Sequence, residues 1–156
     1  MRNLIKDIFT GRNGSFRHGI HPPENKDETN GRPIRQFDFA PLIILPLAQH
    51  IGAPSELVVR EGQEVMRGQL LAKANGYVSV PLHAPVSGKI RKIANVPTIK
   101  GTMSPGIFLE TFPYSTQEVL EGTPVDVNTA SAEEILQGIQ AAGIVGLGGA
   151  AFPTHV

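Results

Sequence analysis

Between residues 34 and 112, short apolar stretches alternate with turn signals. The pattern predicts strands at residues 34–39, 42–45, 57–59, 69–74, 77–80, 89–93 and 107–112. The apolar run at 42–45 lies between two prolines and is typical of a buried strand. Asn75-Gly76 predicts a hairpin, because both residues tolerate positive φ. Strands this short, with turns about every 8 to 12 residues, indicate a small sandwich or barrel.

The chain on either side of this region has a different character. Residues 1–33 are rich in glycine, proline and charge, and they predict an irregular N-terminal arm. Residues 113–125 show little periodicity and predict a linker. Residues 126–156 then predict the start of a second domain. We therefore expect a mainly β domain over residues 34–112, followed by a segment that lacks the length for a core of its own.

A helix is predicted over residues 132–142. Ser131 and Glu134 form a capping box, in which the serine hydroxyl accepts from the third backbone N–H and the carboxylate reaches back. Apolar residues follow at helical spacing, and Gly143 stands where a helix stops.

Composition excludes several classes of protein. The chain has 156 residues, no cysteine, and 14 basic residues against 14 acidic ones. The absence of cysteine removes disulfides, thiolate zinc sites and cysteine-ligated iron–sulfur clusters from this stretch. Zero net charge argues against a nucleic-acid binder. No window holds about 18 uninterrupted apolar residues, so we expect no direct membrane span, and no signal peptide is evident.

The histidines do not predict a metal site. His18 and His21 are separated by three positions, but glycine and proline around them oppose a regular helix that would present both. His50 and His83 stand beside predicted strands, and we expect each to be a hydrogen-bonded structural residue. No residue is predicted as a general acid, general base or nucleophile.

The β region resembles the lipoyl and biotinyl carrier domains. The string from Val58 to Ala72 follows their V-x-G-x-x-V-x-x-G-Q-x-L pattern, and Pro85-Val86-Ser87-Gly88-Lys89-Ile90 follows their later turn. The resemblance implies a barrel-sandwich hybrid over about residues 40–112. We expect its interior to be filled by Val65, Leu70, Leu71 and Ile90. Carrier domains present a modified lysine at a hairpin tip. Here the tip is Asn75-Gly76, and the nearest lysine is Lys73.

A glycine-rich string near the end of the chain carries the main chemical signal. It reads Gly146-Leu147-Gly148-Gly149-Ala150-Ala151-Phe152-Pro153-Thr154. Small residues let a ligand approach the main chain, and successive backbone N–H groups can hold a phosphate. The spacing matches neither a P-loop nor a dinucleotide-binding fingerprint. A flexible linker is the alternative interpretation.

This string resembles the FMN-binding loop of the complex I flavoprotein subunit. The resemblance implies that Gly146, Gly148 and Gly149 let the backbone approach the flavin and its phosphate, while Phe152 and Pro153 shape the loop and Thr154 donates to the phosphate. Ala150, in the same loop, is also a candidate cofactor-binding residue. Ala151 departs from that loop, which has glycine there. Its β-carbon costs little at negative φ but about 1 kcal/mol or more at positive φ.

Four further strings resemble the C subunit of the bacterial Rnf complex, an ion-translocating ferredoxin:NAD oxidoreductase. They are Gly19-Ile20-His21-Pro22-Pro23-Glu24-Asn25-Lys26, Pro46-Leu47-Ala48-Gln49-His50-Ile51-Gly52-Ala53, Arg67-Gly68-Gln69 and His83-Ala84-Pro85-Val86-Ser87-Gly88. The chain is identified as a member of this family, and we expect it to be an N-terminal segment of a longer subunit whose residues 126–156 begin an α/β flavin-binding domain.

The resemblance implies a peripheral subunit on the cytoplasmic face of the bacterial inner membrane, with the other Rnf subunits and NADH as partners. Electrons would pass between NADH and iron–sulfur clusters through FMN, coupled to ion translocation. The two 4Fe–4S clusters would lie downstream, so we expect this chain alone to bind no cofactor and to be inactive. A non-catalytic interaction module and a lipoyl/biotinyl-like carrier domain are the alternatives.

Overall fold

The computed structural model describes residues 23–35, 38–98 and 101–156. The chain divides into two units, residues 1–37 and 38–156. In the described part of the first unit, residues 27–32 form turns, and the N–H groups of Thr29 and Asn30 donate to the Lys26 carbonyl. The strand predicted over residues 34–39 is absent from the described residues of that range, which are irregular.

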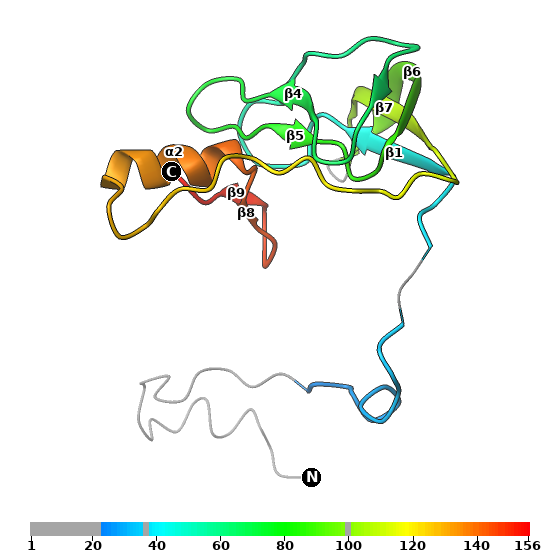
Figure 1. Cartoon of the computed structure of the whole chain (residues 1–156), viewed down its shortest axis with the longest axis horizontal. Helices are drawn as coiled ribbons and strands as arrows, with labels where there is room; N and C mark the ends of the chain where they lie inside the picture. Colours follow the sequence, from blue (N-terminus) through cyan, green and yellow to red (C-terminus); the bar gives the residue numbers. More distant parts are fainter. Residues whose placement is uncertain (1–22, 36–37, 99–100) are drawn as a thin grey trace. The chain divides into compact units, whose positions relative to one another are not determined.

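Two antiparallel sheets build the barrel of the second unit (Figure 1). The larger sheet has the order β1 (Leu42–Pro46), β7 (Met103–Thr111), β6 (Gly88–Pro97) and β3 (Glu64–Val65), and the smaller has the order β2 (Glu56–Leu57), β4 (Leu70–Lys73) and β5 (Leu82–His83). The long β6–β7 hairpin forms the centre of the larger sheet. The predicted small β-barrel is confirmed, although β6 and β7 are longer than the strands predicted at residues 89–93 and 107–112.

The core lies between the two sheets and draws on strands from both. Its buried members are Leu47, Val65, Leu71, Ala72, Ala84, Val86, Ile90, Ile107 and Leu109. Three of the four predicted interior residues are among them. The prediction for Leu70 is wrong, because its side chain is 39% exposed. The pairing of β4 with β5 is irregular between Leu70 and Ala72, and Leu71 and Ala72 are both buried, so Leu70 is left on the outside.

Strand β1 is not the buried strand that its apolar run predicts. It lies at the edge of the larger sheet and, among the described strands, pairs only with β7. Ile43 and Leu45 pack against the core, whereas Leu42 and Ile44 are 48% and 47% exposed. An edge strand with one solvent-facing side alternates in burial even where its residues are uniformly apolar.

The predicted hairpin connects β4 to β5, but its loop is longer than Asn75-Gly76. Gly76 has a φ of +86°, as the turn signal requires. Pairing resumes only at Leu82, opposite Ala72. Residues 74–81, here called the barrel loop, contain the predicted strand 77–80, and that prediction is wrong. Carbonyl groups of the barrel loop bond to two different neighbours, so no ladder with a single strand forms.

Residues 113–125 are irregular, as predicted for a linker, yet they are held against the barrel. We call them the strap. The buried amide of Gln117 accepts from Ser87 N–H at 2.6 Å and donates to the Ser87 carbonyl at 3.2 Å. The N–H of Leu120 donates to the carbonyl of Arg67 at 2.7 Å. These hydrogen bonds therefore fix the position of the strap on the barrel.

Helix α2 (Ala132–Ala141) confirms the predicted helix and its capping box. The Glu134 N–H donates to the Ser131 hydroxyl, and the Ser131 N–H donates to the Glu134 carboxylate at 2.7 Å. The backbone N–H of Ser131, followed by its hydroxyl, holds the pKa of Glu134 below its usual value. Gly143, with a φ of +72°, ends the helix. In the described ranges, no helix is long and apolar enough to cross a membrane.

Candidate functional site

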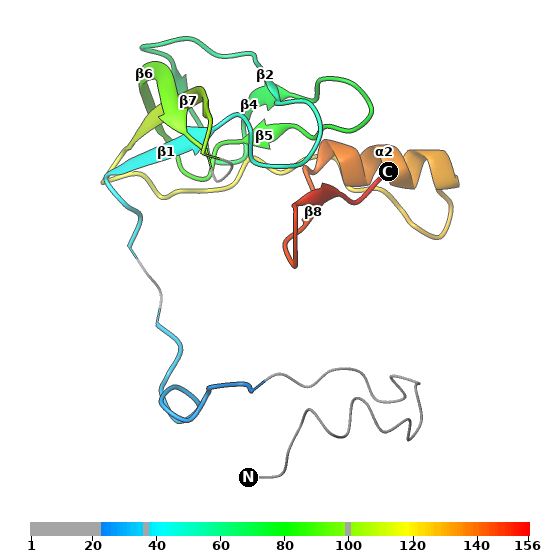
Figure 2. The same cartoon turned by 180° about the vertical axis from the view of Figure 1, so that it is seen from behind.

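The glycine-rich string forms a small hairpin. Strands β8 (Val145–Gly146) and β9 (Phe152–Pro153) pair antiparallel, and residues 147–150 form the turn between them. All four turn residues are exposed. Seen from both sides, the hairpin lies next to α2 and near the β4–β5 end of the barrel (Figures 1 and 2). The candidate ligand-binding residues are therefore displayed together on one short element.

The three glycines of the candidate site are not explained by backbone strain or by packing inside the chain. None of Gly146, Gly148 and Gly149 has a φ in the left-handed region. A β-carbon on Gly148 or Gly149 would meet nothing within 4 Å, and one on Gly146 would meet only the Phe152 carbonyl, at 3.8 Å. Within the described chain, the N–H groups of Gly148 and Gly149 donate to no backbone carbonyl. The space over the turn is open, which fits a backbone that an outside group approaches closely.

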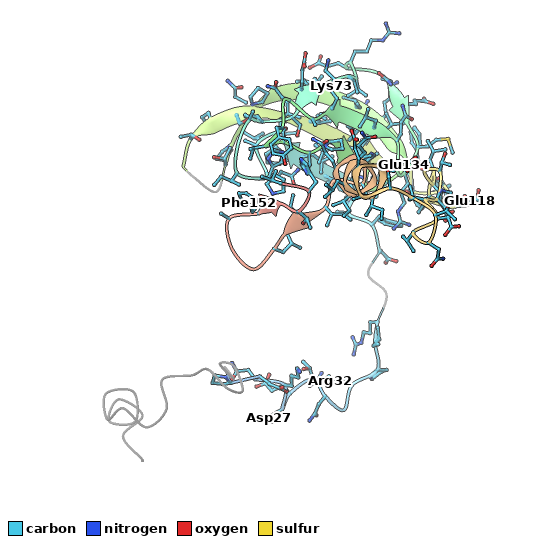
Figure 3. The ribbon with its side chains drawn as sticks, turned by 90° about the vertical axis from the view of Figure 1, so that its left-hand side faces the viewer. Asp27, Arg32, Lys73, Glu118, Glu134 and Phe152 are labelled. Atoms are coloured by element: carbon cyan, nitrogen blue, oxygen red, sulfur yellow. The ribbon has the colours of Figure 1, made fainter. Side chains whose placement is uncertain are left out.

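Burial alternates along the returning strand. Ala151, Pro153 and His155 face inward, whereas Phe152 and Thr154 are exposed. The N–H of Thr154 donates to the Ile144 carbonyl at 3.1 Å, which leaves its hydroxyl as the group that can reach a ligand. Phe152 is 48% exposed on the hairpin (Figure 3). The predicted Phe152 and Thr154 thus share the outward side with the exposed Ala150.

Ala151 adopts the conformation for which glycine is best suited. Its φ is +53°, so the β-carbon stands in the left-handed region at a cost of about 1–2 kcal/mol. The residue is nearly buried, and its carbonyl accepts from the N–H of Ile51 at 3.4 Å. Burial and the hydrogen bond from Ile51 therefore hold Ala151 in its strained conformation.

Lys73, the lysine nearest to the carrier position, ends strand β4 instead of occupying a hairpin tip. It pairs in register with Glu56 of β2, and its ammonium lies 3.2 Å from the Glu56 carboxylate. Both side chains are more than half exposed. Figure 3 shows Lys73 on the sheet, well apart from Phe152 on the hairpin.

His50 confirms its predicted role as a hydrogen-bonded residue, whereas the hydrogen bond expected of His83 stays a prediction. His50 is 6% exposed, and its Nδ1–H donates to the Ile51 carbonyl at 2.9 Å while Nε2 accepts from Val80 N–H at 3.4 Å. His83 is partly buried on β5, and this burial lowers its pKa. The His18 and His21 pair lies outside the described residues. In the part of the chain that is described, no group of three or more metal-ligating side chains gathers.

His155 is a residue that the sequence analysis missed. It is 5% exposed, and its Nε2–H donates to the Tyr77 carbonyl at 2.8 Å. Its Nδ1 is buried and has no hydrogen-bond partner in the described structure. The one available signal was its place directly after Pro153-Thr154, at the end of the glycine-rich string.

Helix α2 leaves an apolar face open. The helix has no fully buried residue. A shallow cavity of about 290 Å³ lies over this face and is lined by Thr123, Val125, Val127, Ile135, Gly138, Ile139 and Ile144. Leu136 and Ile144 are each 47% exposed. Ile144 also lines this cavity, and exposed apolar side chains around a cavity favour a further contact that covers them.

Comparison with known proteins gives a consistent result over nearly the whole chain. The family model described as RnfC barrel sandwich hybrid domain matches residues 14–112. The C subunit of the ion-translocating oxidoreductase complex of Haemophilus influenzae strain Rd is 37% identical over 99% of the chain. The C subunits of the proton-translocating ferredoxin:NAD(+) oxidoreductase complex of Clostridium ljungdahlii and of the Na(+)-translocating complex of Acetobacterium woodii are 40% identical over 91% and 37% identical over 93%. The chain spans 19%, 31% and 33% of these three relatives, respectively.

Proposed function

The chain belongs to the family of Rnf-type C subunits that carry the barrel sandwich hybrid domain, and we propose from this that it is part of the subunit that moves electrons between NADH and iron–sulfur clusters through FMN. The complex would couple this transfer to ion translocation. In the proposal, the subunit is peripheral on the cytoplasmic face of the bacterial inner membrane, and its partners are the other subunits and NADH.

The observation that carries the flavin proposal is the open turn of the β8–β9 hairpin. Gly148 and Gly149 are glycine where neither φ nor internal packing asks for it, and the turn faces open space. These features suit a backbone that lies against a flat ring or a phosphate. Gly146 directly precedes the turn at the end of β8, and Ala150 is the last residue of the turn.

When bound, FMN would accept a hydride and release the electrons one at a time. The residues of this chain would bind and orient it. The turn N–H groups of Gly148 and Gly149 would donate to the phosphate, and the Thr154 hydroxyl would add another donor. Phe152 would offer its half-exposed ring as an apolar contact. No proton transfer is assigned to this chain.

The iron–sulfur chemistry would lie elsewhere in the subunit. Cysteine thiolates are the usual ligands of 4Fe–4S clusters, and this chain contains none. The relatives are three to five times as long as the matched region, which leaves ample length for two such clusters. We expect the chain by itself not to oxidise NADH.

The carrier alternative is less well supported. Lys73 lies within a strand and pairs with Glu56, whereas a carrier lysine must swing freely from a tip. Intact-mass measurement of the protein purified from its own cells decides this point. A lipoyl or biotinyl mass increment on Lys73 would establish the carrier function instead.

The flavin proposal is tested by Gly148→Val in the intact subunit, with Gly122→Val as the matched control. Both positions are free of neighbours within 4 Å in this chain and neither has a positive φ, so neither change should disturb the fold. We expect Gly148→Val to purify with little or no flavin and Gly122→Val to keep the wild-type content. Flavin absorbance per subunit measures this. Equal flavin content in the two variants would refute the assignment of the hairpin.

A further inference from the structure

The barrel loop lies between two other parts of the chain and bonds to both. Its successive carbonyl groups alternate between these neighbours. The carbonyls of Val78 and Val80 accept from residues in segment 50–55, whereas those of Tyr77 and Ser79 accept from the C-terminal part of the chain. The barrel loop therefore connects the barrel to the region that carries the glycine-rich hairpin.

On the barrel side, the loop is held by close contacts. The Val78 carbonyl accepts from Ala53 N–H at 3.2 Å, and the Val80 carbonyl accepts from the Ser55 hydroxyl at 2.8 Å. Ser79 is fully buried, and its hydroxyl donates to the Ala53 carbonyl at 3.0 Å. Gly52 approaches so closely that a β-carbon there would collide with the Val78 carbonyl. Such a loop offers a firm base, unlike a free hairpin tip.

On the other side, three contacts seat the C-terminal region. The Nε2–H of His155 donates to the Tyr77 carbonyl at 2.8 Å, and the side-chain amide of Gln140 donates to the Ser79 carbonyl at 3.1 Å. Gly143 lies so near the Pro81 carbonyl that a β-carbon would come within 2.9 Å of its oxygen. These contacts come from Gln140 of α2, from Gly143 at the end of the helix and from His155, the second residue after β9.

His155 is held in one orientation. Its ring meets the Tyr77 ring edge to face, with centroids 5.6 Å apart. Because a carbonyl can only accept, Nε2 carries the proton of this hydrogen bond, and Nδ1 is the other polar atom of the ring. That atom is buried without a partner in the described structure, which is unfavourable. The ring is thus oriented so that Nε2 bonds to the Tyr77 carbonyl, although Nδ1 is then buried without a hydrogen bond in the described structure.

We propose that the barrel loop is the anchor that positions the glycine-rich hairpin, and that His155 and Gln140 are positioning residues for the ligand bound there. This inference rests on the proposed flavin-binding function. Attachment on both sides of the hairpin, through α2 and through His155, holds its turn in one place before a ligand arrives. A site organised in advance loses less freedom on binding and therefore binds more tightly.

The anchor can be tested without any flavin. The N–H of Ile51 donates across to the Ala151 carbonyl, so its hydrogen exchange reports whether the hairpin stays seated. In the 156-residue chain, His155→Ala should speed exchange at Ile51 at least tenfold while the amides of the β6–β7 ladder are unchanged. Gln140→Ala should act in the same direction. Gln137→Ala is the matched control, because among the described residues its side-chain amide donates to Glu133 on the same helix and makes no hydrogen bond to the barrel loop.

Two conservative variants separate the two ring nitrogens. Glutamine can place an amide N–H near the position of Nε2, whereas asparagine can place its amide only near that of Nδ1. We expect His155→Gln to restore slow exchange at Ile51 and His155→Asn to behave like alanine. Rescue by asparagine alone would assign the role to Nδ1 and overturn the anchor. Unchanged exchange in His155→Ala and Gln140→Ala would overturn it as well.

Flavin affinity of the intact subunit then links the anchor to function. His155→Ala and Gln140→Ala should weaken FMN binding at least tenfold, with rescue by His155→Gln and no effect of Gln137→Ala. If the wild-type subunit binds no FMN, the proposed function fails, and the exchange experiment still decides the anchor. If the wild type binds FMN and His155→Ala binds it equally well, the positioning role is refuted.

Discussion

Gly68→Ala tests whether the strap is seated on the barrel as described. Gly68 has a φ of +87°, and a β-carbon there would collide with the Leu120 carbonyl. Gly62 is the natural control. Its φ of +79° is similar, but a β-carbon there would meet nothing within 4 Å. The two alanine variants share the backbone strain and differ in the contact with the strap.

The magnitudes follow from these contacts. An L-residue at positive φ costs about 1–2 kcal/mol, and this term applies to both variants. The smaller entropy of the unfolded chain with alanine is also common to both and cancels in the difference. Gly68→Ala must in addition displace Leu120, whose N–H bond to the Arg67 carbonyl is 2.7 Å long. Losing that bond and disturbing the neighbouring Gln117 contacts adds about 1–2 kcal/mol.

Equilibrium unfolding in urea measures both free energies. We expect Gly62→Ala to lose about 1 kcal/mol and Gly68→Ala about 2–3 kcal/mol. Gln117→Ala supplies a second comparison, because a loosened strap can move away from the new β-carbon. The extra cost of Gly68→Ala should then shrink in the double variant, as coupled neighbours require. Equal losses for Gly62→Ala and Gly68→Ala, within about 0.5 kcal/mol, would show that the strap does not rest on Gly68.

Two further predictions concern the barrel. Leu71→Ala should lower the free energy of unfolding in urea by about 2–5 kcal/mol, because the Leu71 side chain is fully buried. Leu70→Ala should lower it much less. A larger loss for Leu70→Ala than for Leu71→Ala would mean that the β4 register is wrong. Burial lowers the pKa of His83, so the unfolded chain binds the proton more readily than the folded chain. Stability should therefore fall as pH drops through 6.5, the unperturbed value, and His83→Gln should reduce this dependence; identical pH profiles for His83→Gln and the wild type would contradict it.

Local chemistry explains why several elements could be predicted from the sequence. The capping box of Ser131 and Glu134, with Gly143 after the helix, places both ends of α2 through contacts between near neighbours in the chain. Gly76 likewise indicated a turn, because glycine readily adopts the positive φ that this position has. Family resemblance added the barrel, since its turn glycines and interior apolar residues recur in a specific order.

Long-range packing decided what these signals could not. Leu70 and Leu71 are chemically identical, and only the irregular pairing of β4 with β5 buries one and exposes the other. The apolar β1 is half exposed because its alternate residues Leu42 and Ile44 lie on the side of the sheet that faces away from the core. Composition predicts a linker at residues 113–125, but contacts with distant residues such as Ser87 hold that segment in place.

In the candidate site, too, local signals could be predicted from the sequence and long-range contacts could not. The glycine-rich string was visible in the sequence because small residues and their spacing are local properties. The sequence left open the φ of Ala151 and carried no sign of the bond from His155 to Tyr77, which joins residues 78 positions apart. Side-chain type and spacing thus identified the group of residues that could meet a ligand, while the position of that group depends on a loop of the barrel that only the folded chain brings beside it.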